Sequence, residues 1–415
     1  MLTDIKINDK TIARLSLAVE YTSLYGRHRD ILYFDQFHIW SDADFLPMQM
    51  QLKLIGKRAG YKERFCFSKG ALIKANDVCD LHTIKNQDFN RHPQHNLSIE
   101  PRLGRFYPAA WFNGIIDDNT TKMKPVRIKH IDNEMIQVDF NHALSEYDID
   151  IEIEVFSAYQ EFNEKVLNKT GLHQTGSQSR NCMQDLLLGP GMQLRIKNTA
   201  TDFFSDDPFG RTDTDSDEIF YASPRMVNHL DETALQQVRS LYKELIPKNA
   251  DILDLMSSMN SHLPESIESN KVTGLGMNRE ELDANTALDA RVIHDLNDDS
   301  TLPFADNSFD IVLCTVSVEY LTRPFAVFEE IGRILKPGGK FITTFSNRWF
   351  PTKAIRLWPY LHEFERMGLV SEYFINSKLF KQINTRSVRG LSRPKNDRYT
   401  MPLSDPVYAV WATKS

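Results

Sequence analysis

The chain has 415 residues, of which 41% are hydrophobic and 25% charged, with a formal net charge of −7 at pH 7. This length predicts two or three domains, and the composition is that of a globular protein. Because the net charge is negative, the chain has no global basic field for a phosphate backbone, and nucleic acid is not an expected partner.

Residues 1–162 are predicted to form a mostly β domain. The clearest strand is IDIEIEVF (149–156), in which apolar residues alternate with acids, so that one face is buried. VRIKHI and MIQVDF precede it as two short strands around the turn Asp132–Asn133. The stretch 75–104 is polar and has few apolar residues, which indicates an inserted loop or flap.

Residues 163–200 are predicted to be a linker, because their first half is rich in Gly, Ser, Thr and Gln and has no periodicity. A lead-in segment, 201–245, follows. It contains FYASPRMVNHLD, which places Tyr221, Arg225 and His229 at spacings of four, on one face of a helix. It ends in DETALQQVRSLYKELIP, an amphipathic helix with Asp231 as its N-cap.

From residue 246 to 415 strands and helices alternate. The strands are ILDLM, KVTGLGM, FDIVLCT and KFITTF, and an amphipathic helix that stops at Lys336–Gly339 lies between the last two. Apolar strands separated by helices indicate a parallel sheet covered on both faces. SVRGL and PVYAVWATK are expected to form a closing pair of strands. The second part of the chain is therefore predicted to be an α/β domain.

The stretch LPFADNSFDIVLCTVSVEYLTRPFAVFEEIGRILKPGGKFITTF carries a family resemblance. Its LPF-x-D-x-SFD, VEYL and R-x-LKPGG segments, in this order, resemble the class I S-adenosylmethionine (SAM) dependent methyltransferases of the small-molecule type labelled type 11. The resemblance covers roughly 246–415 and implies a Rossmann-like fold. It also implies that SAM binds at the carboxyl ends of the central strands.

Carried over position by position, the resemblance implies a SAM site formed by Asp254, Met256, Ser257, Ser258, Gly276, Met277, Asn278, Asp295, Leu296 and Thr315. Two positions depart from the family. The first turn has Met256, Ser258 and Asn260 where glycines are usual, and Gly276 stands where an acid usually accepts the ribose hydroxyls. Asn278 could replace part of that acid. Two readings stay open, a working SAM site of altered design and a weak or lost one.

Two histidines are candidate general bases, since a base near neutral pKa would assist an oxygen or amine acceptor. His262 follows the first strand of this domain and His294 precedes Asp295. Tyr320 in VSVEYL is a further catalytic candidate, and Arg348 and Tyr221 are candidate substrate contacts. For each of these residues a purely structural role is the alternative.

The stretch VDFNHALSEYDIDIEIEVF resembles the last strands of FKBP-type peptidyl-prolyl isomerases, in particular the bacterial SlyD-like kind with an inserted flap. This resemblance places Tyr21, Phe34 and Asp35 at the positions of the isomerase pocket. SKGALI stands where that family has an aromatic-glycine turn, so the pocket is incomplete. A module that binds a peptide or docks on the other domain is the alternative to proline isomerisation.

The sequence predicts a cytoplasmic protein without a metal site or membrane segment. No run of about 18 apolar residues occurs, and the four cysteines are widely spaced. The leading functional hypothesis is SAM-dependent methylation of a small molecule. The alternative is an FKBP-type isomerase, or a peptide-binding or folding factor, with a degenerate methyltransferase domain.

Overall fold

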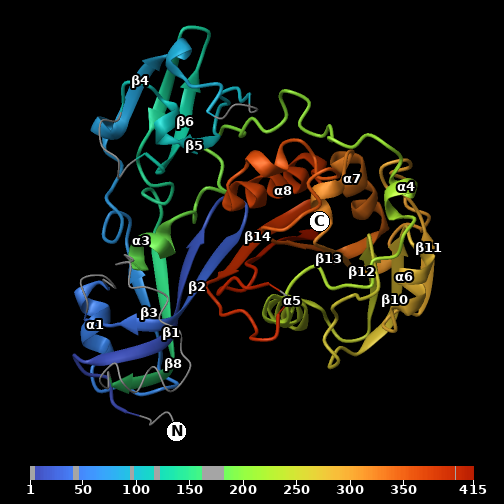
Figure 1. Ribbon diagram of the computed structural model, residues 1–415, viewed down its shortest axis with the longest axis horizontal. Helices are drawn as coiled ribbons and strands as arrows, with labels where there is room; N and C mark the ends of the chain where they lie inside the picture. The colour runs from blue at the N-terminus through green and yellow to red at the C-terminus, as the bar shows by residue number, and fades with distance from the viewer. Residues whose placement is uncertain (1–4, 41–45, 94–97, 116–121, 161–181, 398) are drawn as a thin grey trace.

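The computed structural model describes residues 5–40, 46–93, 98–115, 122–160, 182–397 and 399–415. Its main element is one 11-stranded sheet with the order β11-β10-β9-β12-β13-β15-β14-β2-β1-β8-β3. A separate four-stranded sheet has the order β4-β7-β6-β5 and lies at the top of Figure 1. Strands from both parts of the chain therefore share a single sheet.

The N-terminal strands form the antiparallel end of the main sheet. They are β1 (Thr11–Thr22), β2 (Arg27–His38), β3 (Lys62–Phe67) and β8 (Ile149–Gln160). The predicted alternation of β8 is confirmed, because Ile149, Ile151, Ile153 and Val155 are all buried. The helices α1 (Met48–Leu54) and α3 (Cys182–Leu187) pack on the same core.

The four-stranded sheet is inserted between β3 and β8. Its strands are β4 (Leu81–Lys85), β5 (Phe106–Pro108), β6 (Pro125–Ile131) and β7 (Met135–Asp139), with three 3-10 turns, η1 (Val78–Asp80), η2 (Asn86–Asp88) and η3 (Ala109–Trp111). The predicted hairpin around Asp132–Asn133 is confirmed as β6–β7. Of the two predicted alternatives for 75–104, a loop or a flap, a bare loop is excluded, because β4 lies within it and belongs to the inserted sheet. The stretch looked polar since only one face of so small a sheet is buried.

The C-terminal strands form the other end of the main sheet. They are β9 (Ala250–Leu255), β10 (Ser269–Gly276), β11 (Ala290–Ile293), β12 (Phe309–Thr315), β13 (Leu335–Phe345), β14 (Phe380–Arg389) and β15 (Val407–Lys414). β9 to β13 are parallel, and β15 runs antiparallel between β13 and β14. The strand order reverses between β9 and β12, which is where open α/β sheets bind ligands.

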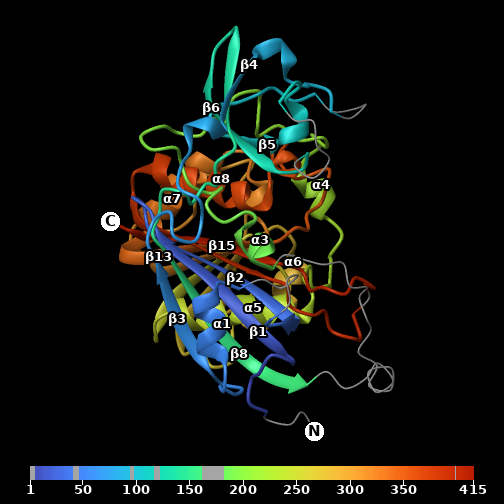
Figure 2. The same ribbon diagram turned by 90° about the vertical axis from the view of Figure 1, so that its left-hand side faces the viewer.

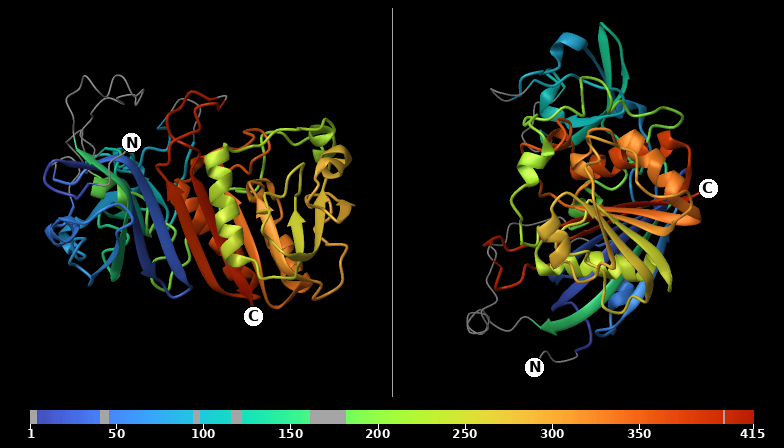
Figure 3. Two further views of the ribbon diagram at one scale, coloured as in Figure 1. Left: turned by 90° about the horizontal axis from the view of Figure 1, so that it is seen from below. Right: turned by 90° about the vertical axis from the view of Figure 1, so that its right-hand side faces the viewer.

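Helices cover both faces of this α/β part (Figure 3). They are α4 (Asp217–Tyr221), α5 (Glu232–Leu245), α6 (Arg279–Ala284), α7 (Pro324–Ile334) and α8 (Glu363–Ser377), with η4 (Val318–Tyr320) and η5 (Trp358–Tyr360). Ile311 and Leu313 of β12 belong to the core under α5, whereas Val312 and Cys314 belong to the core under α7 and α8. The predicted N-cap is confirmed, since Asp231 accepts a hydrogen bond from Ala234 N.

The two ends of the sheet are joined by parallel pairing of β2 with β14, where His28 lies opposite Thr385 and Asp30 opposite Ser387. Figure 2 shows β2 and β15 in the middle of one continuous sheet. The described part of the predicted linker 163–200 is not a flexible connection, because Leu186 and Gln193 are buried against this join. Residues 163–181 lie outside the described residues. None of the described helices has the length and apolar character needed to cross a membrane.

Candidate functional site

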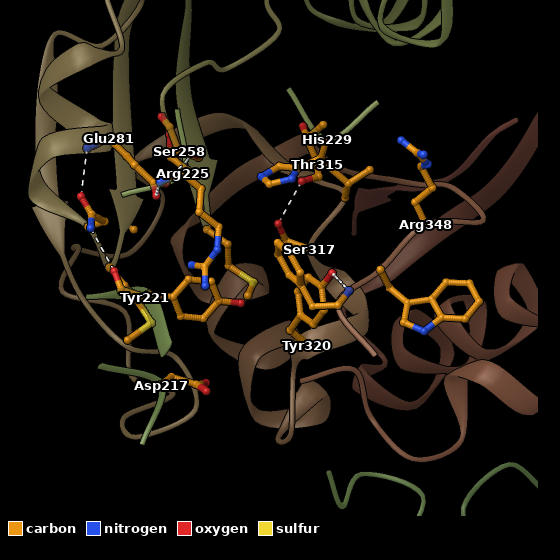
Figure 4. A pocket seen from close by; sticks show the side chains of 18 of the residues that line it. Asp217, Tyr221, Arg225, His229, Ser258, Glu281, Thr315, Ser317, Tyr320 and Arg348 are labelled. Atoms are coloured by element: carbon orange, nitrogen blue, oxygen red, sulfur yellow. Dashed lines mark hydrogen bonds between the residues drawn. The ribbon is translucent and has the colours of Figure 1, made fainter. Parts of the chain in front are cut away.

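A cavity of about 680 Å³ opens at the carboxyl ends of the parallel strands (Figure 4). The residue directly after β9, β10, β11 and β12 lines it in each case: Met256, Met277, His294 and Val316. Every residue predicted for the SAM, catalytic and substrate positions also lines this cavity: Asp254, Met256, Ser257, Ser258, Gly276, Met277, Asn278, Asp295, Leu296, Thr315, His262, His294, Tyr320, Arg348 and Tyr221. The structure thus brings all of them to one place.

The first turn, after β9, keeps a glycine-like backbone without a glycine. Met256 has φ 56°, a left-handed conformation that costs a non-glycine residue about 1–2 kcal/mol. Beneath it the buried carboxylate of Asp254 accepts a hydrogen bond of 2.5 Å from Ser257 Oγ. Burial raises the pKa of Asp254 to about 6, and the hydrogen bonds from Ser257 and Ser261 lower it. Side-chain hydrogen bonds to Asp254 therefore stabilise the conformation of this turn, which in the family glycines would adopt without strain.

The end of β10 has no room for an acid. A Cβ atom on Gly276 would lie 2.2 Å from the carbonyl oxygen of Ser257, which is far inside contact distance. Asn278 does not replace the acid either, because its amide is already used. Its Oδ1 accepts from Glu281 N at 3.1 Å, and its Nδ2 donates to the carbonyl of Tyr221 at 2.9 Å. Asn278 thus caps α6 and ties it to the lead-in segment.

Glu281 in α6 is an acid of the cavity wall that the sequence analysis did not single out. Its side chain joins two other parts of the wall. Oε2 accepts a hydrogen bond from Ser258 Oγ, and Oε1 accepts one from the backbone N–H of Arg225, both at 2.7 Å. Figure 4 shows these three residues next to one another. Only 7% of Glu281 is exposed, so its surroundings are the cavity and these partners.

The edge of the cavity after β11 is built around Asp295 and Asn297. Asp295 Oδ1 accepts from Asn297 N at 2.8 Å, whereas His294 Nε2 bonds to the carbonyl of Asp299 at 2.8 Å. Asn297 Nδ2 reaches across to Asp217 at 2.8 Å. The carboxylate of Asp295 is therefore fixed at the wall by a backbone donor, while the ring of His294 is used by a loop.

His262 lines the cavity with a ring nitrogen that has no hydrogen-bond partner among the described residues. It is 7% exposed and has φ 53°, a second left-handed residue of the cavity wall. Burial lowers its pKa to about 4, with Arg239 and His229 acting in the same direction. At neutral pH the ring is thus uncharged, and its Nδ1 is a buried nitrogen without a partner among the described residues.

Aromatic rings and one arginine form the far wall. The hydroxyl of Tyr320 accepts a hydrogen bond from Phe350 N at 2.9 Å, and burial raises the pKa of Tyr320 well above its usual value. Arg348 lies 3.8 Å from the ring centre of Tyr399 and forms an ion pair with Asp405 at 3.3 Å. Its guanidinium is therefore already engaged by Asp405, which it shares with Arg393 at 2.6 Å, and this weakens its case as the anchor of an anionic substrate.

The lead-in segment crosses the mouth of the cavity, but not as the predicted helix. α4 ends at Tyr221, and Ser223–Pro224 follows; a residue before proline avoids helical geometry, and proline has no N–H to donate. Tyr221, Arg225 and His229 nevertheless all line the cavity. Arg225 stacks 4.3 Å above the ring centre of Phe220. The prediction of a helical face was wrong, although its residues reach the site.

Buried ion pairs hold this segment in place. The Nζ of Lys353, a fully buried side chain, lies 3.1 Å from Asp217 and 3.2 Å from Asp213. Arg211 donates to both carboxylate oxygens of Asp217 at 2.8 Å. The acid Asp217 that lines the cavity is thus fully engaged in fixing the chain. The sequence of 202–218 is acidic and rich in turn residues, and it does not reveal these ion pairs because the partners lie far away along the chain or across a loop.

The three residues predicted for an isomerase pocket do not come together. Tyr21 is buried and bonds to Asp30 at 3.0 Å, Phe34 meets Phe37 edge to face, and Asp35 is exposed beside Arg14. Leu15 on β1 is opposite Phe34, whereas Tyr21 lies six residues further along the same strand. Among the described residues no group of three or more His, Cys, Asp or Glu side chains is placed to hold a metal ion.

Residues 258–343 match the sequence profile of the family described as "Methyltransferase domain". The Ubiquinone/menaquinone biosynthesis C-methyltransferase UbiE of Chromobacterium violaceum is 44% identical over 57 residues, which is 14% of this chain and 23% of that protein. The Sterol 4-C-methyltransferase strm-1 of Caenorhabditis elegans is 46% identical over 41 residues, 10% of this chain and 12% of that protein. The chain spans less than a quarter of the length of the curated relatives it matches.

A solved structure, a SAM dependent methyltransferase from Aquifex aeolicus, is 14% identical. It is superimposed over 49% of this chain and all of that one, with a TM-score of 0.32.

Proposed function

We propose that this chain, whose C-terminal part contains a class I methyltransferase domain, transfers a methyl group from SAM to a small-molecule acceptor. The observation that carries the proposal is the position of the cavity. It lies at the carboxyl ends of parallel strands beside the reversal of strand order, and the segment matched by the family contributes much of its wall.

The residues of the first turn fit SAM in spite of the missing glycines. The left-handed backbone of Met256 leaves the turn as tight as a glycine would, and a cavity of about 680 Å³ is in the range of small-molecule sites. Asp295 and Leu296 would hold the adenine, and Thr315 with the first turn would hold the methionine part. This supports the altered-design reading of the site over the lost one.

The cofactor supplies an electrophilic methyl group when bound. The chain's own contribution is to place the acceptor in line with that group and to keep water away. His262 is proposed as the residue that takes a proton from an oxygen or nitrogen acceptor, because its ring lines the cavity, is uncharged at neutral pH and has no partner for Nδ1 among the described residues. Its lowered pKa makes it a weaker base than an ordinary histidine, so the proposal rests on its position. His294 and Tyr320 are weaker candidates, since a loop carbonyl and Phe350 N already engage them.

The acceptor is proposed to be flat and largely apolar. Tyr320, Trp349, Phe350 and Tyr399 give the far wall mostly ring surface. The guanidinium of Arg225 lies 5.2 Å from the ring centre of Phe350, and its buried Nη1 has no hydrogen-bond partner among the described residues. A small rotation of this side chain toward the acceptor would let Nη1 donate to one of its oxygens. Neither a nucleic acid nor a membrane is proposed as the substrate.

The N-terminal part is proposed to be an FKBP-like module that serves as a docking platform and not as an isomerase. An insertion between β3 and β8 stands where the resemblance puts the flap, which supports the relationship. The scatter of Tyr21, Phe34 and Asp35 speaks against a proline pocket. The catalytic part is the C-terminal one.

The proposal is tested by titrating the full chain with SAM and with S-adenosylhomocysteine in a calorimeter. Micromolar binding that weakens in Asp295→Ala is expected. Transfer of a labelled methyl group from SAM to small molecules of a protein-free cell extract would then identify the acceptor. No binding up to millimolar ligand would refute the proposal.

A further inference from the structure

The cavity lacks the acid that dinucleotide-type sites use for ribose hydroxyls at the end of the second strand. The reason is geometric. A Cβ at Gly276 would overlap the carbonyl oxygen of Ser257, and the same turn is fixed by a hydrogen bond of 2.8 Å from Ser257 N to Leu275 O. An aspartate at Gly276 would therefore require the first turn to move. The hydroxyls of a ribose bound in this site therefore need a hydrogen-bond acceptor from another residue.

The acids of the cavity wall are Asp217, Asp254, Glu281 and Asp295. Asp217 is consumed by Arg211, Lys353 and Asn297, and Asp254 lies under the first turn, 2% exposed and bonded to Ser257. Asp295 lies two residues after β11, the strand that follows β10, and the resemblance assigns it to the adenine. Glu281 is the acid on α6, the helix that directly follows Gly276.

Glu281 is both buried and oriented. Each of its carboxylate oxygens accepts one hydrogen bond, from Ser258 Oγ and from Arg225 N. An ionised carboxylate offers roughly four acceptor positions, so two remain for a ligand. Burying a carboxylate with only two neutral donors is costly unless something further is gained. The described residues include no Lys or Arg side chain in an ion pair with Glu281.

Two departures from the family are connected through this contact. Ser258 stands at a position where the resemblance has glycine, and its hydroxyl is what orients Glu281. Figure 4 shows Ser258, Glu281 and Arg225 close together, with Tyr320 further across the cavity. The serine in the first turn therefore orients a carboxylate near the strand end at which the family's acid is missing.

We infer that Glu281 takes over the role of the missing strand-end acid and accepts hydrogen bonds from the ribose hydroxyls of SAM. Ser258 Oγ and the backbone N–H of Arg225 hold its carboxylate in place from the other side. The inference rests on the proposed function. It adds that a residue of α6 recognises the ribose and that the lead-in segment, through the N–H of Arg225, helps to orient that residue.

The test compares two ligands on the full-length protein by calorimetry: S-adenosylhomocysteine and its 2′-deoxy analogue. The wild type is expected to prefer the hydroxylated ligand at least 10-fold, because a carboxylate–hydroxyl pair is lost with the analogue. In Glu281→Gln this preference should fall to about twofold, with weaker binding of S-adenosylhomocysteine. Glu280→Gln is the matched control, since it removes the same charge one residue away at an exposed position.

Ser258→Ala provides a second route if Glu281→Gln reduces folding. It removes only the orienting hydroxyl and should reduce the preference severalfold while leaving the melting temperature nearly unchanged. Binding of S-adenosylhomocysteine with an undiminished preference in both variants would overturn the inference and leave the proposed function intact. Failure of the wild type to bind either ligand would overturn both.

Discussion

The join between β2 and β14 and the wall of the cavity are both buried and polar, yet they are built in opposite ways. At the join, Tyr21 and Ser387 both donate to Asp30, and His28 bonds to Thr385 at 2.8 Å. In this Asp30 network no side chain has a buried polar atom without a hydrogen-bond partner, although Nε of Arg386 and of Arg389, also on β14, has none among the described residues. This network needs nothing from outside the chain.

The cavity wall is incomplete and strained. His262 Nδ1 and Arg225 Nη1 are buried without partners among the described residues. Left-handed backbone is also found at Met256, His262 and Val316. Most other non-glycine residues with this geometry are Asn or Asp, which tolerate it. Strain collects at functional sites, so three left-handed residues around one cavity mark it as a place prepared for ligands. The paired Asp30 network marks the join as architecture.

The largest effect is expected from Asp30→Ala at the join. The change leaves the hydroxyls of Tyr21 and Ser387 buried without an acceptor, which should reduce the free energy of unfolding by about 3 kcal/mol. Urea unfolding measures it, and Asp35→Ala, at an exposed site on the same strand, should cost less than about 1 kcal/mol. A normal stability in Asp30→Ala would show that the join is not the architectural element described.

His262→Ala should sharpen the other side of the comparison. Loss of a general base is expected to lower the methyl-transfer rate roughly 100-fold, with little change in stability or in the affinity for S-adenosylhomocysteine. Because burial lowers the pKa of His262 to about 4, the base form dominates above that pH, so the wild-type rate should not decline between pH 7 and 5 through this group. An unchanged rate in the variant would remove His262 from the chemistry.

Gly276→Ala should disturb the cavity wall by steric overlap alone. The new methyl group meets Ser257 O, and overpacking of this kind typically costs about 2 kcal/mol. Gly338→Ala is the comparison, since Gly338 has φ +81° and no atom near its Cβ position, so that only backbone strain of about 1 kcal/mol is added. Thermal unfolding of the two variants distinguishes steric overlap from backbone strain. An equal loss of stability in both variants would contradict the overlap between the new methyl group and Ser257 O.

The smallest effect concerns Glu319, behind the cavity wall. Burial raises its pKa to about 8, against a lowering by Arg366, and neither of its carboxylate oxygens has a hydrogen-bond partner among the described residues. Between the ordinary pKa of 4.5 and about 8 the folded chain keeps a proton that the unfolded chain has lost. The free energy of unfolding therefore falls as pH rises through this range and stops falling above the folded pKa. Between pH 7 and 9 the wild type should lose roughly 1 kcal/mol more than Glu319→Gln. Parallel losses in both proteins would contradict the assignment.

Much of the fold and of the cavity was predictable, because local patterns determine them. The alternation of β8, the cap of α5 and the apolar strands follow from neighbouring residues. The cavity residues were carried over from the family resemblance, and the rule that parallel strands end at one edge explains why they meet. The pairing of β2 with β14 joins residues more than 350 positions apart and leaves no local signal. Glu281 in REELDA looks like a solvated helix acid, and only the distant contacts with Ser258 and Arg225 bury it.

The single shared sheet limits how the chain can be divided. If the two parts were expressed separately, β2 and β14 would each become an open edge, with backbone donors and acceptors no longer covered. Open edges of this kind pair with other chains, so both fragments are expected to aggregate or to exchange strands. Any dissection by truncation therefore has to blunt these two strands first, for example with proline or lysine, before the behaviour of a fragment says anything about its role.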